Sequence, residues 1–370
     1  MKKLNILVCV FLASLVVSCT KKDMPSKSEI SEAAVTNIGL AHHTTSVSRE
    51  STLLVTTLAG SKTMAGDQDG EGANALFYQI YDITKDDTGN LYVTDQRNYA
   101  IKRITPSGTV TTVFRAANDF GYETLGGIVL DGLGNILYSD EPWKHIRKVD
   151  ANRVVTTFAG TTGTGGNADG PGTQAQFWFP SRMVKDPEGN IYVLDFNSIR
   201  KITPSGEVST FVGGGPRDLN GNSLDGKGTK ASFKSPKGIT IDKKGNLFVT
   251  EQGKVRKVAH NGVVTTVAGG NLLGDVDGQG ANARFHYTGG IAVDQSGNLY
   301  VVDEGNFKVK KVTPTGQVTT IAGVAQWVQH PVDGTAETAR FAAPRGITID
   351  ASGQILYVVD GHTVRMITGF

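Results

Sequence analysis

From Ser51 onward the chain consists of short runs of strand-forming residues separated by turn residues. The pattern is clearest between Asp277 and Gly323. Its four runs are Gly290–Asp294, Asn298–Asp303, Lys308–Thr313 and Val318–Ala322. Turn formers such as Ser296-Gly297 and Pro314-Thr315-Gly316 lie between them. This alternation predicts a four-stranded antiparallel meander.

The same meander recurs along the chain in six copies. A Gly-Asn pair opens the second run of five copies, and Gly353-Gln354 takes its place in the sixth. The pairs are Gly89-Asn90, Gly134-Asn135, Gly189-Asn190, Gly245-Asn246 and Gly297-Asn298. A period of roughly 45 to 56 residues indicates a radial or solenoid architecture.

Both faces of each sheet carry apolar residues. In Gly245–Thr250, Leu247 and Val249 point to one face and Phe248 to the other. Neighbouring copies must therefore cover both faces, and twisted sheets stacked in this way close around an axis. The predicted fold class is all-β, a six-bladed β-propeller of four-stranded antiparallel blades.

The sixth copy lacks a fourth run, because Gly346–Asp350, Ile355–Asp360 and Thr363–Ile367 are its only three. The missing run has a counterpart at the front, where Thr52–Gly60 matches Val263–Gly269. We therefore predict that this N-terminal strand completes the last blade and closes the ring.

The first residues have the features of an export signal. Lys2-Lys3 precede the apolar run Ile6–Val17, which is too short to span a membrane as a stable helix, and small residues precede Cys19. This segment resembles a bacterial lipoprotein signal peptide with its lipobox, which implies cleavage before Cys19 and acylation of that cysteine. An ordinary secretory signal with a chance cysteine is the alternative.

The resulting domain prediction has three parts: a lipoprotein signal peptide at 1–18, a flexible polar tether at 19–49, and the propeller at 50–370. Thr20, which follows the cysteine, resembles its counterpart in lipoproteins sent to the outer membrane. We therefore expect a protein anchored by lipid in the outer membrane of a Gram-negative bacterium, either periplasmic or surface-exposed.

Charge and cysteine content narrow the possible partners. The formal net charge is +2, and removal of Lys2 and Lys3 brings it to about zero, which gives no electrostatic case for nucleic acid. Cys9 leaves with the signal, so the mature chain has no disulfide. We expect a monomer that contacts the membrane through its lipid anchor only.

The repeated motifs resemble those of NHL-repeat proteins. The resemblance rests on runs such as VTTVAGG, GDVDGQGANARF and NLYVVDEGNFKVKKV, and it covers Ser51 to Phe370. It is greatest to exported NHL lipoproteins of Gram-negative bacteria. The resemblance implies a propeller but no single function, because that fold hosts enzymes, RNA binders and protein or glycan binders.

Carboxylates that recur in equivalent places indicate structural roles. One set ends the second strand, where a carboxylate can accept backbone N–H bonds from the following loop: Asp95, Asp140, Asp195, Glu251, Asp303 and Asp360. Another lies in Asp-Gly turns: Asp69, Asp169, Asp225, Asp277 and Asp333. Asp67 and Asp275 extend two of these turns to Asp-x-Asp-Gly, which suggests calcium, but the later carboxylate of a calcium loop is missing. Turn chemistry is the favoured interpretation.

Residues that differ between copies are candidates for ligand binding. They concentrate on the side that carries the connections into the first strands and between the second and third strands, which we call the top side; the hairpins occupy the bottom side. The candidates are Tyr78, Tyr81, Asp82, Trp143, Trp178, Arg182, Lys237, His286, Tyr287, Trp327 and Arg345. Aromatic planes beside charged groups suit a sugar or a peptide. Alternatively, each Trp pins its own loop.

Known propeller enzymes offer an alternative. A resemblance to the NHL-type lyase implies a channel zinc held by histidines, and of His145, His286, His330 and His362 only His286 adjoins an innermost strand. A gluconolactonase-like cation site needs channel carboxylates, and Asp82 is the sole acid at the mouth. We therefore predict a non-catalytic envelope lipoprotein that binds a glycan, peptide or protein on its top side without a cofactor. The alternative is a metal-dependent lyase or lactonase with a divalent cation at the channel mouth.

Overall fold

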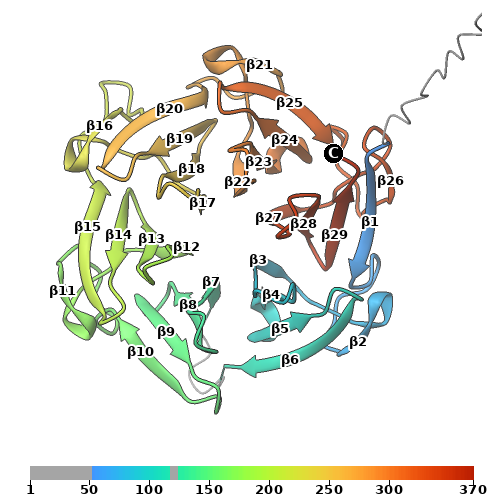
Figure 1. Ribbon diagram of the computed structural model, residues 1–370, viewed down its shortest axis with the longest axis horizontal. Helices are drawn as coiled ribbons and strands as arrows, with labels where there is room; N and C mark the ends of the chain where they lie inside the picture. Colours follow the sequence, from blue (N-terminus) through green and yellow to red (C-terminus); the bar gives the residue numbers. More distant parts are fainter. Residues whose placement is uncertain (1–51, 117–123) are drawn as a thin grey trace, which may run out of the picture. The chain divides into compact units, whose positions relative to one another are not determined.

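Six antiparallel sheets surround a central axis in the computed structural model, which describes residues 52–116 and 124–370 (Figure 1). The predicted signal peptide, the tether and Cys19 lie outside these residues. In the part of the chain that is described, no helix is long and apolar enough to cross a membrane.

Each blade contains four main strands, of which the first in chain order lies nearest the axis, and in five blades a two-residue strand pairs with the outermost of the four. Blade one consists of β2 (Gly70–Glu71), β3 (Ile80–Lys85), β4 (Leu91–Asp95), β5 (Ala100–Ile104) and β6 (Thr109–Arg115). Blade two consists of β7 (Leu125–Leu130), β8 (Ile136–Asp140), β9 (His145–Val149) and β10 (Val155–Ala159). Blade three consists of β11 (Gly170–Pro171), β12 (Pro180–Lys185), β13 (Ile191–Asp195), β14 (Ser198–Ile202) and β15 (Glu207–Gly213).

The remaining blades follow the same order. Blade four consists of β16 (Gly226–Lys227), β17 (Gly238–Ile241), β18 (Leu247–Glu251), β19 (Lys254–Val258) and β20 (Val263–Gly269). Blade five consists of β21 (Gly278–Gln279), β22 (Thr288–Val293), β23 (Leu299–Asp303), β24 (Lys308–Val312) and β25 (Gln317–Ala322). Blade six consists of β26 (Gly334–Thr335), β27 (Pro344–Ile349), β28 (Ile355–Asp360), β29 (Thr363–Thr368) and β1 (Leu54–Ala59).

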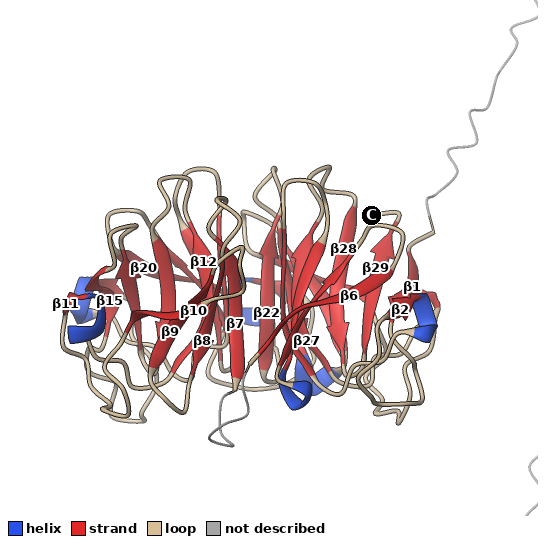
Figure 2. Cartoon of the chain, turned by 90° about the horizontal axis from the view of Figure 1, so that it is seen from below, coloured by secondary structure: helices blue, strands red, loops and turns tan. Residues whose placement is uncertain are grey.

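Short 3₁₀ turns lie at the outer rim of the ring and in loops on one side of the strands (Figure 2). They are η1 (Gly72–Asn74), η2 (Gln96–Asn98), η3 (Gly172–Gln174), η4 (Gly228–Lys230), η5 (Gly280–Asn282) and η6 (Glu304–Asn306).

The predicted ring closure is confirmed. β1 pairs antiparallel with β29, with Val55 opposite Ile367 and Thr57 opposite Arg365. In Figure 1 the blue N-terminal strand lies between the red strands β29 and β26. The first described strand of the chain therefore supplies the fourth strand of the last blade.

The blades differ from the four-stranded prediction at their outer edges. Five sheets carry a fifth strand of two residues contributed by the Asp-Gly turn, such as Gly70 opposite Val110 in blade one. Among the described residues, the sheet of blade two has the four strands β7 to β10, and the sequence of the segment before it lacks an Asp-Gly turn. A strand of two residues is too short to show an alternation of apolar and polar residues, so the sequence pattern did not predict it.

The hydrophobic core is divided among the interfaces between blades. In five blades a fully buried phenylalanine precedes the first strand, and it packs between its own blade and the preceding one. These residues are Phe77, Phe177, Phe233, Phe285 and Phe341. Each buried ring contributes about 1.5–3 kcal/mol, so stability is spread around the ring.

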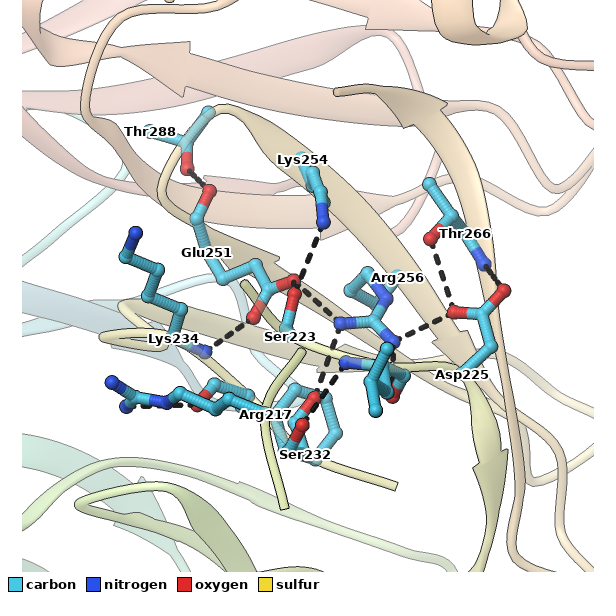
Figure 3. Close-up of polar contacts among 12 residues, drawn as sticks. Arg217, Ser223, Asp225, Ser232, Lys234, Glu251, Lys254, Arg256, Thr266 and Thr288 are labelled. Atoms are coloured by element: carbon cyan, nitrogen blue, oxygen red, sulfur yellow. Dashed lines mark hydrogen bonds and ion pairs between the residues drawn. The ribbon is translucent and has the colours of Figure 1, made fainter. Parts of the chain in front are cut away.

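A buried cation on the third strand lies against each of these phenylalanines. Arg256 is representative: its guanidinium lies 5.4 Å from the Phe233 ring and binds Glu251 and Asp225 (Figure 3). Asp225 also accepts from Thr266 on the fourth strand. The equivalent cations are Lys102, Arg200, Lys310 and Arg365. The Asp-Gly carboxylate therefore joins the third and fourth strands of its blade.

The carboxylates at the ends of the second strands have a different partner from the one predicted. Asp195 accepts the backbone N–H groups of Trp178 and Phe179, which lie in the loop leading into the first strand. Asp360 does the same for Ala342 and Ala343. Asp95 and Asp303 also accept backbone N–H groups of the preceding loop, and in addition they accept the side-chain amides of Asn98 and Asn306 in the following loop. These carboxylates therefore help to fix the top-side loops that carry the candidate residues.

The two Asp-x-Asp-Gly turns occur in the blades whose buried cation is lysine. Lys310 pairs with both Asp275, at 2.8 Å, and Asp277, at 3.1 Å. Lys102 likewise pairs with Asp67 and Asp69. In the arginine blades the broader guanidinium instead reaches a backbone carbonyl of the same turn. The extra aspartate thus completes a lysine site, which accounts for the motif without calcium.

Candidate functional site

The two sides of the ring differ in their exposed aromatic side chains. Among the described residues, all the aromatic residues with exposed side chains lie in top-side loops: Tyr78, Trp178, Phe179, Phe196, Tyr287 and Trp327. Exposed apolar residues of the bottom hairpins, such as Leu133, are aliphatic. Five of these aromatic residues form two groups, in blade three and at the junction of blades six and one, while Tyr287 lies apart in the loop before the first strand of blade five.

At the top end of the channel, Asp82 and Arg182 form an ion pair that crosses the ring. Arg182 donates from Nε to Asp82 at 3.0 Å, from Nη2 to the Tyr81 carbonyl at 2.9 Å, and from Nη1 to the Lys237 carbonyl at 3.0 Å. The guanidinium also stacks over the Tyr81 ring, 4.6 Å from its centre. A side chain from blade three therefore ties blade one to blade four.

Both members of this pair are buried, Asp82 at 7% and Arg182 at 4% exposure. Burial raises the pKa of Asp82, while Arg182 and the Ile128 N–H act to lower it. Burial also raises the pKa of the nearby Glu304 carboxyl, an effect opposed by Arg182, Arg345 and Lys237. Asp82 is thus fully engaged by the protein, and the carboxylate needed for a cation site at the mouth already has a cationic partner.

Glycines make room for this ion pair. In register with Asp82 and Arg182, the other four blades place Gly127, Gly238, Gly290 and Gly346. A Cβ on Gly127 would lie 2.5 Å from the Arg182 Cα, and one on Gly238 would lie 2.4 Å from the Gly289 carbonyl. The glycines at the predicted channel mouth therefore allow the inner strands to approach one another, and the top end of the channel is occupied by protein.

Below the ion pair, the channel is a cavity of about 990 Å³ lined by the first strands of all six blades. Its upper lining includes Asp82 and Arg182, followed by a level of buried apolar residues. That level comprises Ile83, Ile128, Met183, Ile239, Ile291 and Ile347. The cavity extends to bottom-side hairpin residues such as Asp86 and Asn135.

A second cavity, of about 420 Å³, opens on the top side between blades six and one. It brings together three of the predicted residues, Tyr78, Trp327 and Arg345. His362 also lines it, with its ring 6.3 Å from that of Tyr78. We call this cavity the six–one cleft.

The aromatic group of blade three, which we call the blade-three patch, consists of Trp178, Phe179 and Phe196. The rings of Phe179 and Phe196 are 5.8 Å apart, and the Lys144 ammonium lies 4.0 Å from the centre of the Phe179 ring. Phe196 is 53% exposed and has a φ of 56°. Blade six has Gly361, with a φ of 61°, at the equivalent position.

The remaining predicted residues are dispersed. His286 and Tyr287 are neighbours with ring centres 4.6 Å apart, in the loop before β22. Trp143 is half-buried in blade two, and its carbonyl accepts the Gly163 N–H. The Lys237 side chain is exposed, whereas its carbonyl binds Arg182.

The histidines of the described residues are not grouped into a metal centre. Within residues 52–116 and 124–370, no three His, Cys, Asp or Glu side chains are grouped so that they could hold a metal ion. His145 is buried, and its Nε2 lies 3.0 Å from the Thr162 hydroxyl. Burial, with a contribution from Arg147, lowers the pKa of His145 to about 4.

Sequence reasoning missed Phe179 and Phe196. Both had a usable signal, because each occupies a position where most other copies carry a polar or small residue. It also missed Arg97 and Lys62, which line the six–one cleft. Lys62 follows β1, so its position beside blade six depends on ring closure.

Comparisons with known proteins agree with this architecture. The family model described as the Teneurin NHL domain matches residues 215–277. NHL repeat-containing protein 2 of Bos taurus is 31% identical over 277 residues, which cover 64% of this chain and 38% of that protein. The chain thus spans well under half the length of this relative.

Two solved structures share the fold at low sequence identity. A structural genomics protein of unknown function from Bacteroides thetaiotaomicron has a TM-score of 0.66 and 20% identity, covering 85% of this chain and 76% of that one. An auxiliary nutrient binding protein from Bacteroides ovatus has a TM-score of 0.65 and 19% identity, covering 86% and 76%. The fold is that of a six-bladed β-propeller. More particularly, the chain's sequence is similar to those of NHL-repeat proteins.

Proposed function

We propose that the protein is a non-catalytic binding module of the cell envelope that captures a glycan on its top side. The observation that carries the proposal is the confinement of the exposed aromatic side chains to that side. An aromatic face offers a flat apolar surface to the C–H face of a sugar ring, and neighbouring polar groups supply hydrogen bonds.

Phe196 supports the proposal through its backbone. A left-handed conformation costs a residue other than glycine about 1–2 kcal/mol, and an exposed phenylalanine recovers little of this by burial. Blade six has a glycine, Gly361, at the equivalent left-handed position. Backbone strain held by an exposed aromatic side chain is typical of a functional position.

The fold neighbours offer independent support. The protein from Bacteroides ovatus is described as an auxiliary nutrient binding protein, and a role in nutrient capture fits a propeller that presents one aromatic side. We further propose that acylated Cys19 anchors the chain in the outer membrane. The tether of residues 19–49 would then let the propeller stand about 30 Å away from the membrane.

A glycan binding screen with the full chain tests the proposal. We expect binding to at least one oligosaccharide, with affinity reduced about tenfold or more in Trp178→Ala or Trp327→Ala, since truncating a tryptophan that dominates a binding surface costs about 2 kcal/mol or more. Leu133→Ala, on the bottom side, is the matched control and should bind like the parent. Equal binding by all variants would remove the basis of the proposal.

Metal analysis tests the enzymatic alternative. The protein purified without chelator or affinity-tag metal should contain far less than one equivalent of zinc or calcium. One equivalent, lost when Asp82 is changed to Asn, would instead support a metal-dependent enzyme with its site at the channel mouth.

A further inference from the structure

The six–one cleft has an excess of positive charge. Three cations line it, Lys62, Arg97 and Arg345, together with one carboxylate, Asp360. That carboxylate is 1% exposed and accepts from the Ala342 and Ala343 N–H groups and from Arg365. It is therefore neutralised within blade six and presents no negative charge to the cleft.

The three cations differ in the number of hydrogen bonds and ion pairs that they make within the protein. Lys62 pairs with Asp333 at 2.6 Å, and Arg97 donates from Nε to the Gln79 side chain at 3.2 Å. Among the described residues, the half-exposed guanidinium of Arg345 makes no hydrogen bond or ion-pair contact, and its charge acts on the Glu304 carboxyl only through space. The donors of Arg345 are thus available to a ligand.

The same cleft provides flat apolar surfaces and amides. Trp327 is 67% exposed, and Tyr78 lies half-exposed beside the His362 ring. The side chains of Gln79 and Gln329 are also part of the lining. Aromatic planes next to amides suit a ligand with an apolar ring face and hydroxyl groups at its edge.

We infer that the six–one cleft binds an acidic saccharide, whose ring stacks on Trp327 or Tyr78 and whose carboxylate or sulfate ester pairs with Arg345. This inference rests on the proposed glycan-binding function and names its ligand class. A guanidinium presents paired donors that match the two oxygens of an anionic group. The attraction for an anion comes from the cations that line the cleft, since the formal net charge of the whole chain is only +2.

The test compares ligands that differ only in charge. Titration calorimetry with the full chain would use tetragalacturonate and its methyl-esterified form, which keeps the sugar rings and removes the negative charge. We expect the acid to bind about tenfold to a hundredfold more tightly than the ester, the range for a hydrogen bond to a charged group. The preference should weaken as salt is added.

Variants assign the effect to the cleft. Arg345→Gln should abolish the preference for the acid, whereas Lys230→Gln, an exposed charge on blade four, should leave it unchanged. Arg97→Gln provides a second variant from a different blade, and parent-like melting temperatures would show that the variants are folded. A sulfated galactan tetramer tested in parallel shows which anion is favoured, because the preferred one should lose more affinity in Arg345→Gln.

The outcomes separate this inference from the proposed function. Equal affinity for acid and ester, or a preference that survives Arg345→Gln, would overturn the acidic ligand. Neutral saccharides would then still bind through Trp327, and the proposed function would stand. Absence of binding to acidic and neutral saccharides alike would overturn both.

Discussion

Removing the charge of Asp82 should destabilise the propeller more than any ordinary surface substitution. In Asp82→Asn the side chain keeps its shape, but the Arg182 guanidinium stays buried without a counter-ion. Breaking a buried pair in this way costs about 3–5 kcal/mol. We expect the lower end of this range, about 3 kcal/mol, because the carbonyls of Tyr81 and Lys237 continue to accept from Arg182.

The corresponding change in melting temperature follows from the size of the domain. An unfolding entropy of about 2.1 cal/mol/K per residue over roughly 320 residues gives about 0.7 kcal/mol/K. A loss of about 3 kcal/mol should therefore lower the melting temperature by roughly 4–5 °C. Urea unfolding should give the same free-energy difference with an unchanged denaturant slope.

The double variant Asp82→Leu/Arg182→Met is the control for this argument. Replacing a buried pair by apolar residues of similar volume is often neutral or stabilising, so the double variant should be at least as stable as the parent within about 1 kcal/mol. A cost below about 1 kcal/mol for Asp82→Asn alone would refute the reasoning. It would mean that the two carbonyls and Glu304 suffice to balance the charge.

Three further predictions concern other parts of the ring. Gly127→Ala should destabilise the protein by at least about 1–3 kcal/mol in urea unfolding, because its Cβ would contact the backbone of Arg182; parent-like stability would contradict the close approach. Phe196→Gly should be no less stable than the parent, since it relieves a left-handed phenylalanine, yet should weaken glycan binding; a clear loss of stability would argue against strain. Two buried groups should give opposite pH dependences. The pKa of His145 is lowered to about 4 from 6.5, so its contribution to stability is lost as pH falls from 6.5 towards 4. The pKa of Asp303 is raised by burial to about 6 from 3.8, so its contribution is lost as pH rises from 4 towards 6. Chemical denaturation between pH 4 and 7 should therefore show a shallower acid-side loss for His145→Gln and a steeper one for Asp303→Asn; slopes that change in the same direction would contradict these assignments.

Much of the fold could be predicted because its signals are local and repeated. The alternation in Gly245–Thr250 identifies a strand buried on both faces, and repetition of the meander sets the number of blades. The match of Thr52–Gly60 to other fourth strands located the closure correctly. The sequence did not predict which loop the carboxylates at the ends of the second strands would bind. The carboxylate of Asp195, for example, could have accepted from the loop on either side of its strand.

The candidate site was less predictable because its members meet across the ring. Asp82 and Arg182 are separated by 100 residues and by an intervening blade, and the sequence does not state the distance between inner strands. The requirement for glycine at position 127 can be recognised only once that distance is known. Similarly, Trp327 and Tyr78 share a cleft only because blades six and one become neighbours when the ring closes.

The origin of β1 at the front of the chain has a consequence in time. Of the described strands, β1 is synthesised before all the others and its partner β29 after all the others. At about 5–20 residues per second, the roughly 300 residues between them take roughly 15–60 s to synthesise. Throughout that interval a strand rich in Leu, Val and Thr has no native partner, which is the condition under which strands pair with other chains. Slow synthesis of the middle blades would lengthen this interval. In a chain that stops before β29, β1 would never gain its partner strand.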